Sequence, residues 1–348
     1  MTALTDINPP TLEDVARTAK VSTATVSRCL NQPGQVSEAT RARVMEAVEK
    51  LGYTPNFSAR ALAAKRTFTI GAIIPTMENA IFARGLQAFQ ETLNERGYTL
   101  LVSSNGYDPD QEAEQVKTLV ARGADGLLLI GYERDESVYD FLASRNVPYL
   151  LSWAHRPEVD RPAIGFENCQ SMVAMTNEVC ARGHRYIGII AGTIAGNDRA
   201  ADRVKGIRLC LEEQGIDLDT VPLVEKPYSV ANGAAAFEDL IRANPHLTAV
   251  ICVNDVLAAG AMDRARDMGL SIPGDLSITG FDDIELASLV EPKLTTVHVP
   301  HRHMGTQAAL ELIRTVEQKE KTELPKLESH VVVRGTLGAP RQTALRLT

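Results

Sequence analysis

The chain has 348 residues, 44% of them hydrophobic, and a net charge of -8 at pH 7, so it is long enough for two or three compact units. The charge is uneven, since residues 1–66 hold nine Lys and Arg against six Asp and Glu, while the rest of the chain holds 27 against 38. An acidic chain of this kind is not a general binder of nucleic acid. A basic head on an acidic body can nevertheless meet phosphate through the head alone.

Residues 11–31 predict two short helices joined by a tight turn. Thr11 is followed three residues later by an acidic side chain, a capping signature that starts the first helix at Leu12. Apolar side chains then recur at i, i+3, i+4 and i+7, which is one face of an amphipathic helix. Ser22 can cap a second helix over residues 23–30.

A third helix is expected from Ser37 to about Leu51, where Gly52 ends it. Its apolar side chains and those of the first two helices would share one small core. The sequence therefore predicts a three-helix unit at the start of the chain.

The second of these helices leaves Thr23, Ala24, Ser27 and Arg28 pointing outward. Small side chains let a helix lie deep in the major groove, and Arg28 can donate two hydrogen bonds to O6 and N7 of a guanine. Other polar groups suit phosphate oxygens, which set the register of a protein on DNA without reading its sequence. These phosphate candidates are Ser22, Thr25, Ser27 and Asn31. The alternative is a helical hairpin whose hydroxyls act only as helix caps.

A short helical segment is expected after an extended linker. Residues 53–55 form the linker, because proline disfavours helix in the residue before it. Asn56 can then cap residues 57–65, which have good helix propensity but are too few to be stable alone. We expect this segment to fold only against a partner.

This region resembles the lactose-repressor (LacI/GalR) family of transcription regulators in three stretches: LEDVARTAKVSTATVSRCLN, GYTPN, and SARALAAKRT ahead of the strand TIGAIIP. The resemblance continues to about residue 336. It implies that Thr23, Ala24 and Arg28 read bases, with Ala24 contacting a thymine methyl or leaving room for a base. It also implies a hinge helix that orders on operator binding, and a wedge, Leu62, in the minor groove at the centre of a palindrome. The alternative for Leu62 is a linker leucine packed on the next domain.

From Thr67 onward, apolar strand patterns alternate with helical patterns. Short apolar runs between helices indicate parallel strands, so we expect two doubly wound α/β subdomains with a ligand between them, at the carboxyl ends of the strands. Strands are expected at 69–75, 98–103, 126–130, 147–151, 186–191, near 223, at 249–253 and at 276–280. Helices are expected at 82–96, 111–122, 171–182, 199–214, 231–243 and 256–268, with one more between the third and fourth strands.

The predicted architecture is an all-α helix-turn-helix head joined to an α/β body of two doubly wound parallel-sheet subdomains, like that of periplasmic binding proteins. The head spans 10–55, the hinge helix and linker 56–66, the body 67–340 and a tail 341–348. One subdomain combines 67–166 with 299–326, and the other combines 167–298 with 327–340.

The resemblance also assigns an effector site, whose candidate residues lie mostly just past strand ends. They are Asn79, Phe82, Trp153, Arg203, Tyr228, Asn254 and Asp282. Arg203 can donate to vicinal hydroxyls or a carboxylate, Asp282 can accept from hydroxyls, and Asn254 can do both. The aromatic rings offer flat faces to a sugar. A sugar or sugar acid is therefore the expected effector, and a nucleobase or nucleoside is the alternative.

Some of these residues also have ordinary structural interpretations. Phe82 can be helix core, Trp153 can be loop packing, and Asp282 can cap the helix that follows it. Trp153 also departs from several family members, which carry an acidic residue at that point, so no particular ligand transfers from the family.

Enzyme and metal interpretations find little support in the sequence. His298, His301 and His303 lie around a proline at an expected crossover between subdomains, without companion Cys or acidic ligands. The sequence has no GxxxxGK[ST] loop and no GxSxG elbow. We expect no catalytic site, no metal and no cofactor.

Cysteine usage and hydropathy bear on where the protein works. The five cysteines are odd in number and include no CxxC pair, which suits a reducing compartment: Cys29, Cys169, Cys180, Cys210 and Cys252. No secretion signal precedes the first expected helix, and no apolar run reaches the ~18 residues of a membrane span. We expect a cytoplasmic protein with no membrane partner.

The leading hypothesis is a homodimeric transcription regulator, acting as a repressor, that binds a palindromic DNA operator and responds to a small effector. The alternatives are a cytoplasmic carbohydrate-binding protein without operator activity and an enzyme built on the same body. Residues 334–348 lack sustained leucine heptads, so no coiled coil is expected to join dimers into tetramers.

Overall fold

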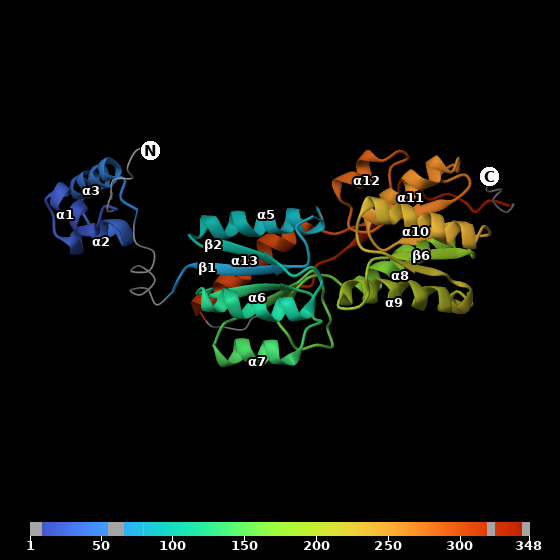
Figure 1. The fold of residues 1–348 in the computed structure, drawn as a ribbon, viewed down its shortest axis with the longest axis horizontal. Helices are drawn as coiled ribbons and strands as arrows, with labels where there is room; N and C mark the ends of the chain where they lie inside the picture. The colour runs from blue at the N-terminus through green and yellow to red at the C-terminus, as the bar shows by residue number, and fades with distance from the viewer. Residues whose placement is uncertain (1–8, 55–65, 79, 319–323, 343–348) are drawn as a thin grey trace, which may run out of the picture. The chain divides into compact units, whose positions relative to one another are not determined.

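The computed structural model describes residues 9–54, 66–78, 80–318 and 324–342. The chain divides into two compact units, Met1–Thr67 and Phe68–Thr348, which are treated separately below as the head and the body (Figure 1). Leu62 and the expected hinge helix lie outside the described residues, as does Asn79.

The head is the predicted three-helix unit. Thr11 and Asp14 form a capping box, in which the Asp14 N–H donates to Thr11 Oγ1 at 3.3 Å and the Thr11 N–H donates to Asp14 Oδ2 at 2.9 Å. Gly52 ends the third helix at φ 61°, a left-handed conformation that glycine adopts without strain. The helices are α1 (Leu12–Ala19), α2 (Thr23–Asn31) and α3 (Glu38–Leu51), with a 3-10 turn η1 (Pro33–Gln35).

One apolar core holds these helices together. Val15 and Val26 are fully buried, and Val44 of the third helix packs in the same cluster. Cys29 and Tyr53 complete this core, although the sequence pattern did not single them out. Ser37 occupies the N-cap position of α3 as expected, but its side chain makes no cap hydrogen bond.

The first half of the body is a five-stranded parallel sheet in the order β2-β1-β3-β4-β5. Its strands are β1 (Thr69–Ile74), β2 (Thr99–Ser104), β3 (Gly126–Ile130), β4 (Tyr149–Ser152) and β5 (Ala163–Ile164). Helices cover both faces, with α5 and α13 on one and α6 and α7 on the other (Figure 1). These helices are α5 (Ala80–Glu95), α6 (Pro109–Ala121), α7 (Glu136–Ser144) and α13 (His301–Gln318).

The second half is a four-stranded parallel sheet in the order β7-β6-β8-β9. Its strands are β6 (Ile187–Ala191), β7 (Leu223–Glu225), β8 (Ala249–Cys252) and β9 (Ser277–Thr279). Its helices pack as the pairs α8 with α9 and α10 with α11. They are α8 (Asn168–Ala181), α9 (Asp198–Glu213), η2 (Leu218–Thr220), α10 (Val230–Ala243), α11 (Asp255–Asp267) and α12 (Glu285–Leu289).

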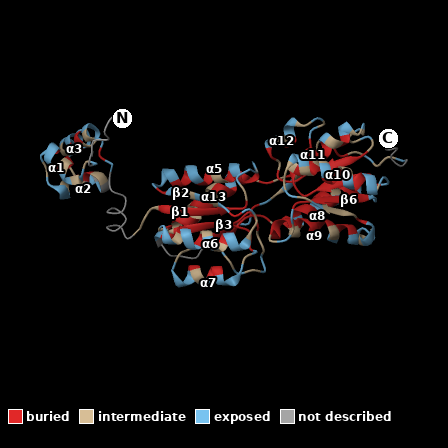
Figure 2. Cartoon of the chain, viewed as in Figure 1, coloured by how far each residue is buried: buried red, intermediate tan, exposed pale blue. Residues whose placement is uncertain are grey.

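A short antiparallel pair links the two halves. β10 (Thr296–His298) pairs with β11 (His330–Val332), and both contact α8. The chain therefore passes between the halves after β5, before α13 and again before β11. The central strands of both sheets are buried, the edge strands β2 and β7 are partly exposed, and the outer faces of the helices are exposed (Figure 2). No helix in the described part of the chain has the length and apolarity needed to cross a membrane.

Candidate functional site

The second helix of the head presents an exposed polar face. Thr23, Ala24 and Arg28 are exposed, as the helical pattern predicts. No acidic side chain of the described residues forms an ion pair with the Arg28 guanidinium, so its donors are available to a partner. These three side chains lie within residues 23–28 of α2, about one and a half turns of the helix.

The four phosphate candidates lie at the start of α2 and along it. Ser22 accepts the Thr25 N–H at 3.2 Å, and the two hydroxyl groups lie 2.9 Å apart, so Ser22 does serve as a helix cap. Thr25 and Ser27 are half-buried. Asn31 is the last residue of α2, and its side chain lies outside the described residues.

In the body, Arg203 lies at the centre of a buried polar cluster. Its Nε donates to Asn168 Oδ1 at 2.8 Å, its Nη1 to the Val253 carbonyl at 2.8 Å and its Nη2 to Asp282 Oδ1 at 3.2 Å. The guanidinium carbon also lies 3.7 Å from the centroid of the Phe281 ring. These contacts join four segments that are far apart in the sequence.

Asp282 and Asn254 form the opposite side of this cluster. Asn254 caps α11 by accepting the Leu257 N–H at 2.9 Å, and its Nδ2 donates to Asp282 Oδ2 at 3.5 Å. Burial raises the pKa of Asp282 to about 6, although Arg203 opposes this shift. Asp282 has φ 107°, and the N-cap of α12 is Ile284, so the capping interpretation of Asp282 is wrong.

Two tyrosines lie beside this cluster. The Asn197 side chain donates to the Tyr228 hydroxyl at 3.2 Å, and the Tyr107 and Tyr228 ring centroids are 5.8 Å apart. Burial raises the pKa of Tyr107, and Arg203 and Asp282 both influence it electrostatically. Tyr107 and Asn197 lie next to the predicted residue Tyr228 but were not predicted, because Tyr107 lies in a loop and Asn197 is the N-cap of α9.

Trp153 and Phe82 lie together in the first half of the body, with ring centroids 5.4 Å apart. Trp153 directly follows β4 with φ 63° and is 1% exposed, and its Nε1 has no hydrogen-bond partner among the described residues. A Cβ atom on Gly85 would lie 2.5 Å from the Trp153 ring, so only glycine fits there. The Trp153 carbonyl accepts from Asn168, which connects this pair to the polar cluster.

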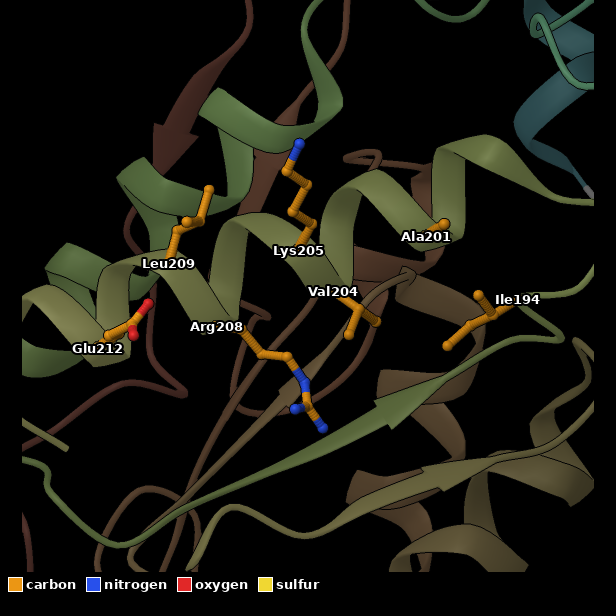
Figure 3. Close-up of a pocket in the computed structure, with 7 residues that line it drawn as sticks. All are labelled: Ile194, Ala201, Val204, Lys205, Arg208, Leu209 and Glu212. Carbon is orange, nitrogen blue, oxygen red and sulfur yellow. The ribbon is translucent and has the colours of Figure 1, made fainter. Parts of the chain in front are cut away.

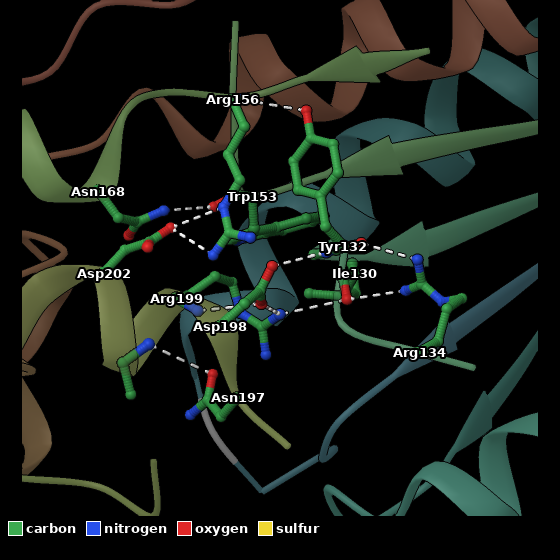
Figure 4. Close-up of polar contacts among 12 residues, drawn as sticks. Ile130, Tyr132, Arg134, Trp153, Arg156, Asn168, Asn197, Asp198, Arg199 and Asp202 are labelled. Carbon is green, nitrogen blue, oxygen red and sulfur yellow. Dashed lines mark hydrogen bonds and ion pairs between the residues drawn. The ribbon is translucent and has the colours of Figure 1, made fainter. Parts of the chain in front are cut away.

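The start of α9 bonds directly to the first half of the body (Figure 4). Asp198 Oδ2 accepts the Tyr132 N–H at 2.6 Å, and Arg199 Nη1 donates to the Ile130 carbonyl at 3.2 Å. Arg156 and Asp202 add an ion pair of 2.9 Å across the same junction. The sequence did not predict these contacts: two of them use backbone groups, which leave no trace in the residue types, and the third joins side chains that are 46 residues apart.

A small pocket lies at this junction, at the carboxyl ends of the strands. Its lining comes from both halves and includes Ile73, Asn105, Tyr107, Ile130, Glu133 and Arg199. A second, shallower hollow lies along α9, with Ile194, Val204 and Leu209 flanked by Lys205, Arg208 and Glu212 (Figure 3). None of the predicted effector residues that the structure describes lines the pocket or the hollow.

The three histidines of HVPHRH have different surroundings. His301 Nε2 donates to the Asp282 carbonyl at 3.1 Å, and His298 Nδ1 lies 2.8 Å from Asp283 Oδ2. His303 is exposed. The part of the chain that the structure describes contains no cluster of three or more His, Cys, Asp or Glu arranged to hold a metal.

A three-helix head with an exposed polar helix face and a body of two parallel α/β halves define a class of protein, the ligand-responsive DNA-binding regulator. Residues 11–56 match the model for bacterial regulatory proteins of the lacI family, and residues 176–337 match a periplasmic binding protein-like domain.

Individual relatives agree with this class. The chain is 32% identical to the HTH-type transcriptional repressor CytR of Escherichia coli (strain K12), over 94% of this chain and 96% of CytR. It is similar in structure to a Lac repressor dimer bound to operator and the anti-inducer ONPF, with TM-score 0.84 and 27% identity over 95% of this chain and 100% of that one. A complex of the transcriptional regulator CelR with cellobiose gives TM-score 0.69 and 28% identity, over 94% of this chain and 99% of that one.

The chain therefore belongs to the LacI family. It is a DNA-binding transcription regulator with an effector-binding domain, and the enzyme hypothesis is set aside because its relatives are regulators. The predicted fold class is confirmed. The roles of the individual site residues remain predictions.

Proposed function

We propose that this protein is a repressor that binds a palindromic operator as a homodimer and is controlled by a small effector bound between the two halves of the body. The observation that carries the effector proposal is the buried Arg203–Asp282 pair at the carboxyl ends of the strands. Polar groups of this kind, converging beside aromatic rings, are typical of a small-ligand site.

On DNA, Arg28 would read a guanine, while Thr23 and Ala24 would define the neighbouring positions. Ser22, Thr25, Ser27 and Asn31 would contact phosphates, and Leu62 would enter the minor groove. A single head on a half-site binds weakly, so two heads on a palindrome account better for specific binding. The Lac repressor that resembles this chain is a dimer bound to operator.

In the body, Asn254 and Asp282 would bind hydroxyl groups held against Tyr228, while Phe82 and Trp153 would supply apolar faces and Asn79 a further amide. Sugars fit this combination, and the similar CelR structure contains cellobiose. A nucleobase or nucleoside is the second candidate, because the Tyr107 and Tyr228 rings can also pack against a base.

Control of DNA binding would pass through the junction between the halves. An effector shifts a conformational equilibrium only by as much as its affinity differs between the two states. Asp198 and Arg199 bond to the backbone of Tyr132 and Ile130, so a rotation of the halves would break these contacts. An effector that contacts both halves would bind one arrangement more tightly than the other and so supply the difference. The segment from Asn56 to Lys65 would pass this change to the DNA-bound heads.

Three experiments test the proposal. Selection of bound DNA from a random library by the full-length protein should yield a palindrome, and no sequence preference at moderate salt would exclude operator binding. A thermal-shift screen of sugars, sugar acids and nucleobases should find a stabilising ligand, since ~100 Kd of ligand stabilises by about 2.7 kcal/mol. Sedimentation should give a dimer at micromolar concentration.

The scattered free cysteines agree with a cytoplasmic location.

A further inference from the structure

Resting on the proposed function, we infer that the effector is electrically neutral and bears hydroxyl or N–H donors, so that sugar acids and nucleotides are rejected. Two features of the site support this. The pairing of its charges favours a neutral ligand, and the hydrogen-bonding capacity that two buried side chains have left favours a ligand with hydroxyl or N–H groups.

The two guanidinium groups at the junction are already paired with carboxylates of the protein. Arg199 is 2.8 Å from Asp198, and Arg203 is 3.2 Å from Asp282, with all four side chains less than a tenth exposed. An anionic effector would therefore enter a buried site whose positive charges are already neutralised. Removing its charge from water would lack compensation.

The neighbouring acidic group offers an anion no compensating charge. Asp255 is fully buried one residue after Asn254, where it accepts from Thr296 Oγ1 at 2.6 Å. Burial raises the pKa of Asp255 well above its usual range, and Asp282 raises it further, so the neutral carboxyl is favoured. A carboxyl in either form, beside the Arg203–Asp282 pair, does not attract an anion.

The tautomer of the His301 ring gives the second argument. Its Nε2 faces the Asp282 carbonyl, which can only accept, so Nε2 carries a proton. Burial lowers the pKa of His301 to about 4, so the ring is neutral at pH 7 and its Nδ1 is a bare acceptor. This Nδ1 is buried without a partner among the described residues. A hydroxyl or N–H can donate to it, whereas a carboxylate or phosphate dianion cannot.

Trp153 supplies a donor in the same neighbourhood. Its Nε1–H is buried and unpartnered within the described residues, and the Trp153 ring and the His301 backbone both lie against Gly85. Asn168 connects Trp153 to Arg203, because it donates to the Trp153 carbonyl and accepts from Arg203 Nε. His301 bonds directly to the Asp282 carbonyl. A hydroxyl group, which both donates and accepts, satisfies either atom.

The test is calorimetric titration of the full-length protein at pH 7.5 with matched neutral and anionic ligands. The pairs are D-glucose with D-gluconate, D-galactose with D-galacturonate, and cytidine with cytidine monophosphate. We expect at least one neutral member to bind, and to bind at least ~10-fold more tightly than its anionic partner, the equivalent of one unpaired buried group. An anionic member that binds as tightly as its neutral partner would overturn the inference, as would a panel in which no neutral member binds.

A variant tests the cause of this preference. Asp282→Asn is nearly isosteric but leaves Arg203 without its carboxylate, so the ratio between neutral and anionic members should fall or reverse. Asp275→Asn, which makes the same change at a surface carboxylate bonded to Ser271, should leave the ratio unchanged. An unchanged ratio in Asp282→Asn would overturn the charge argument.

The outcome is separable from that of the proposed function. A protein that selects a palindromic operator but prefers an anionic effector retains the proposed function and loses this inference. A protein without sequence preference for DNA loses the proposed function, whichever ligand it binds.

Discussion

The head and the body hold their candidate functional residues in opposite ways. Thr23, Ala24 and Arg28 lie close together on one helix and are exposed. Arg203 and Asp282 are buried, lie 79 residues apart, and are bonded to each other. A DNA-reading surface depends on groups left free, whereas an effector site depends on groups that hold one another in place. Substitutions should therefore separate function from stability in the head but not in the body.

The largest effect is expected from Arg203→Ala. Removing one partner of a buried ion pair leaves Asp282 buried without its counter-charge, which costs about 3–5 kcal/mol in the free energy of unfolding. The response to effector should also disappear, while operator binding without effector persists. Urea unfolding and operator titration with and without effector measure both results.

Arg182→Ala is the matched control, because Arg182 pairs with Glu178 on the surface of one helix. It should change stability by about 0.5 kcal/mol or less. Loss of operator binding in Arg203→Ala without effector would instead assign Arg203 a purely structural role.

The next largest effect is a pH dependence of stability that comes from His301. The folded pKa of His301 is lowered to about 4, whereas an unfolded histidine titrates near 6.5, so the unfolded chain binds the extra proton between these values. The free energy of unfolding should therefore fall as pH drops through this window, by up to about 3 kcal/mol. Asp282, whose pKa is raised to about 6, acts in the opposite direction between pH 6 and its unfolded value.

His301→Phe should remove only the first contribution, so the variant should lose less stability than the wild type between pH 7.5 and 5. His246→Phe, at an exposed histidine, should keep the wild-type dependence. Equal losses in the wild type and in His301→Phe, measured by urea unfolding at both pH values, would contradict the assignment.

Packing between α8 and α9 gives the third prediction. A Cβ atom on Gly206 would lie 2.2 Å from the Cys169 carbonyl oxygen, so Gly206→Ala forces the two helices apart. We expect a loss of about 2 kcal/mol in the free energy of unfolding. Gly34→Ala in the head has open space around its Cβ and should be nearly neutral. A neutral Gly206→Ala variant would show that the body is not rigid at this contact.

The smallest effect on stability is expected in the head, from Arg28→Ala. The exposed side chain should change the free energy of unfolding by no more than about 0.5 kcal/mol. Discrimination at one position of each half-site should nevertheless fall by about 1–3 kcal/mol. Arg43→Ala, at another exposed arginine of the head, should leave base preference intact. Equal weakening on all DNA sequences by Arg28→Ala would refute base reading.

Elements defined by local sequence were predicted, whereas elements defined by distant partners were not. The helices of the head were predicted from caps and apolar periodicity, because Thr11, Ser22 and Gly52 act on their own helix. The longer strands of the body were predicted for a similar reason, since each is a local apolar run. β5, β10 and β11 were missed because they have only two or three residues and are defined by their partners.

The candidate site likewise contains residues that the sequence predicted and contacts that it did not. Arg203, Asn254 and Asp282 were singled out through the family resemblance, and the structure brings them together. The contacts of Asp198 and Arg199 with the backbone of Tyr132 and Ile130 had no signal in the sequence, because a carbonyl or N–H acts in the same way whatever its side chain. The unpartnered Nδ1 of His301 depends on a tautomer that only the Asp282 carbonyl decides.

The central claim is that specificity for DNA resides in the free face of α2 while control resides in the body. The most direct measurement is operator selection by the full-length wild type, Arg28→Ala and Arg203→Ala in parallel. We predict that the wild type and Arg203→Ala select the same palindrome, and that Arg28→Ala selects one with a relaxed position in each half. A palindrome unchanged by Arg28→Ala, or altered by Arg203→Ala, would contradict the account.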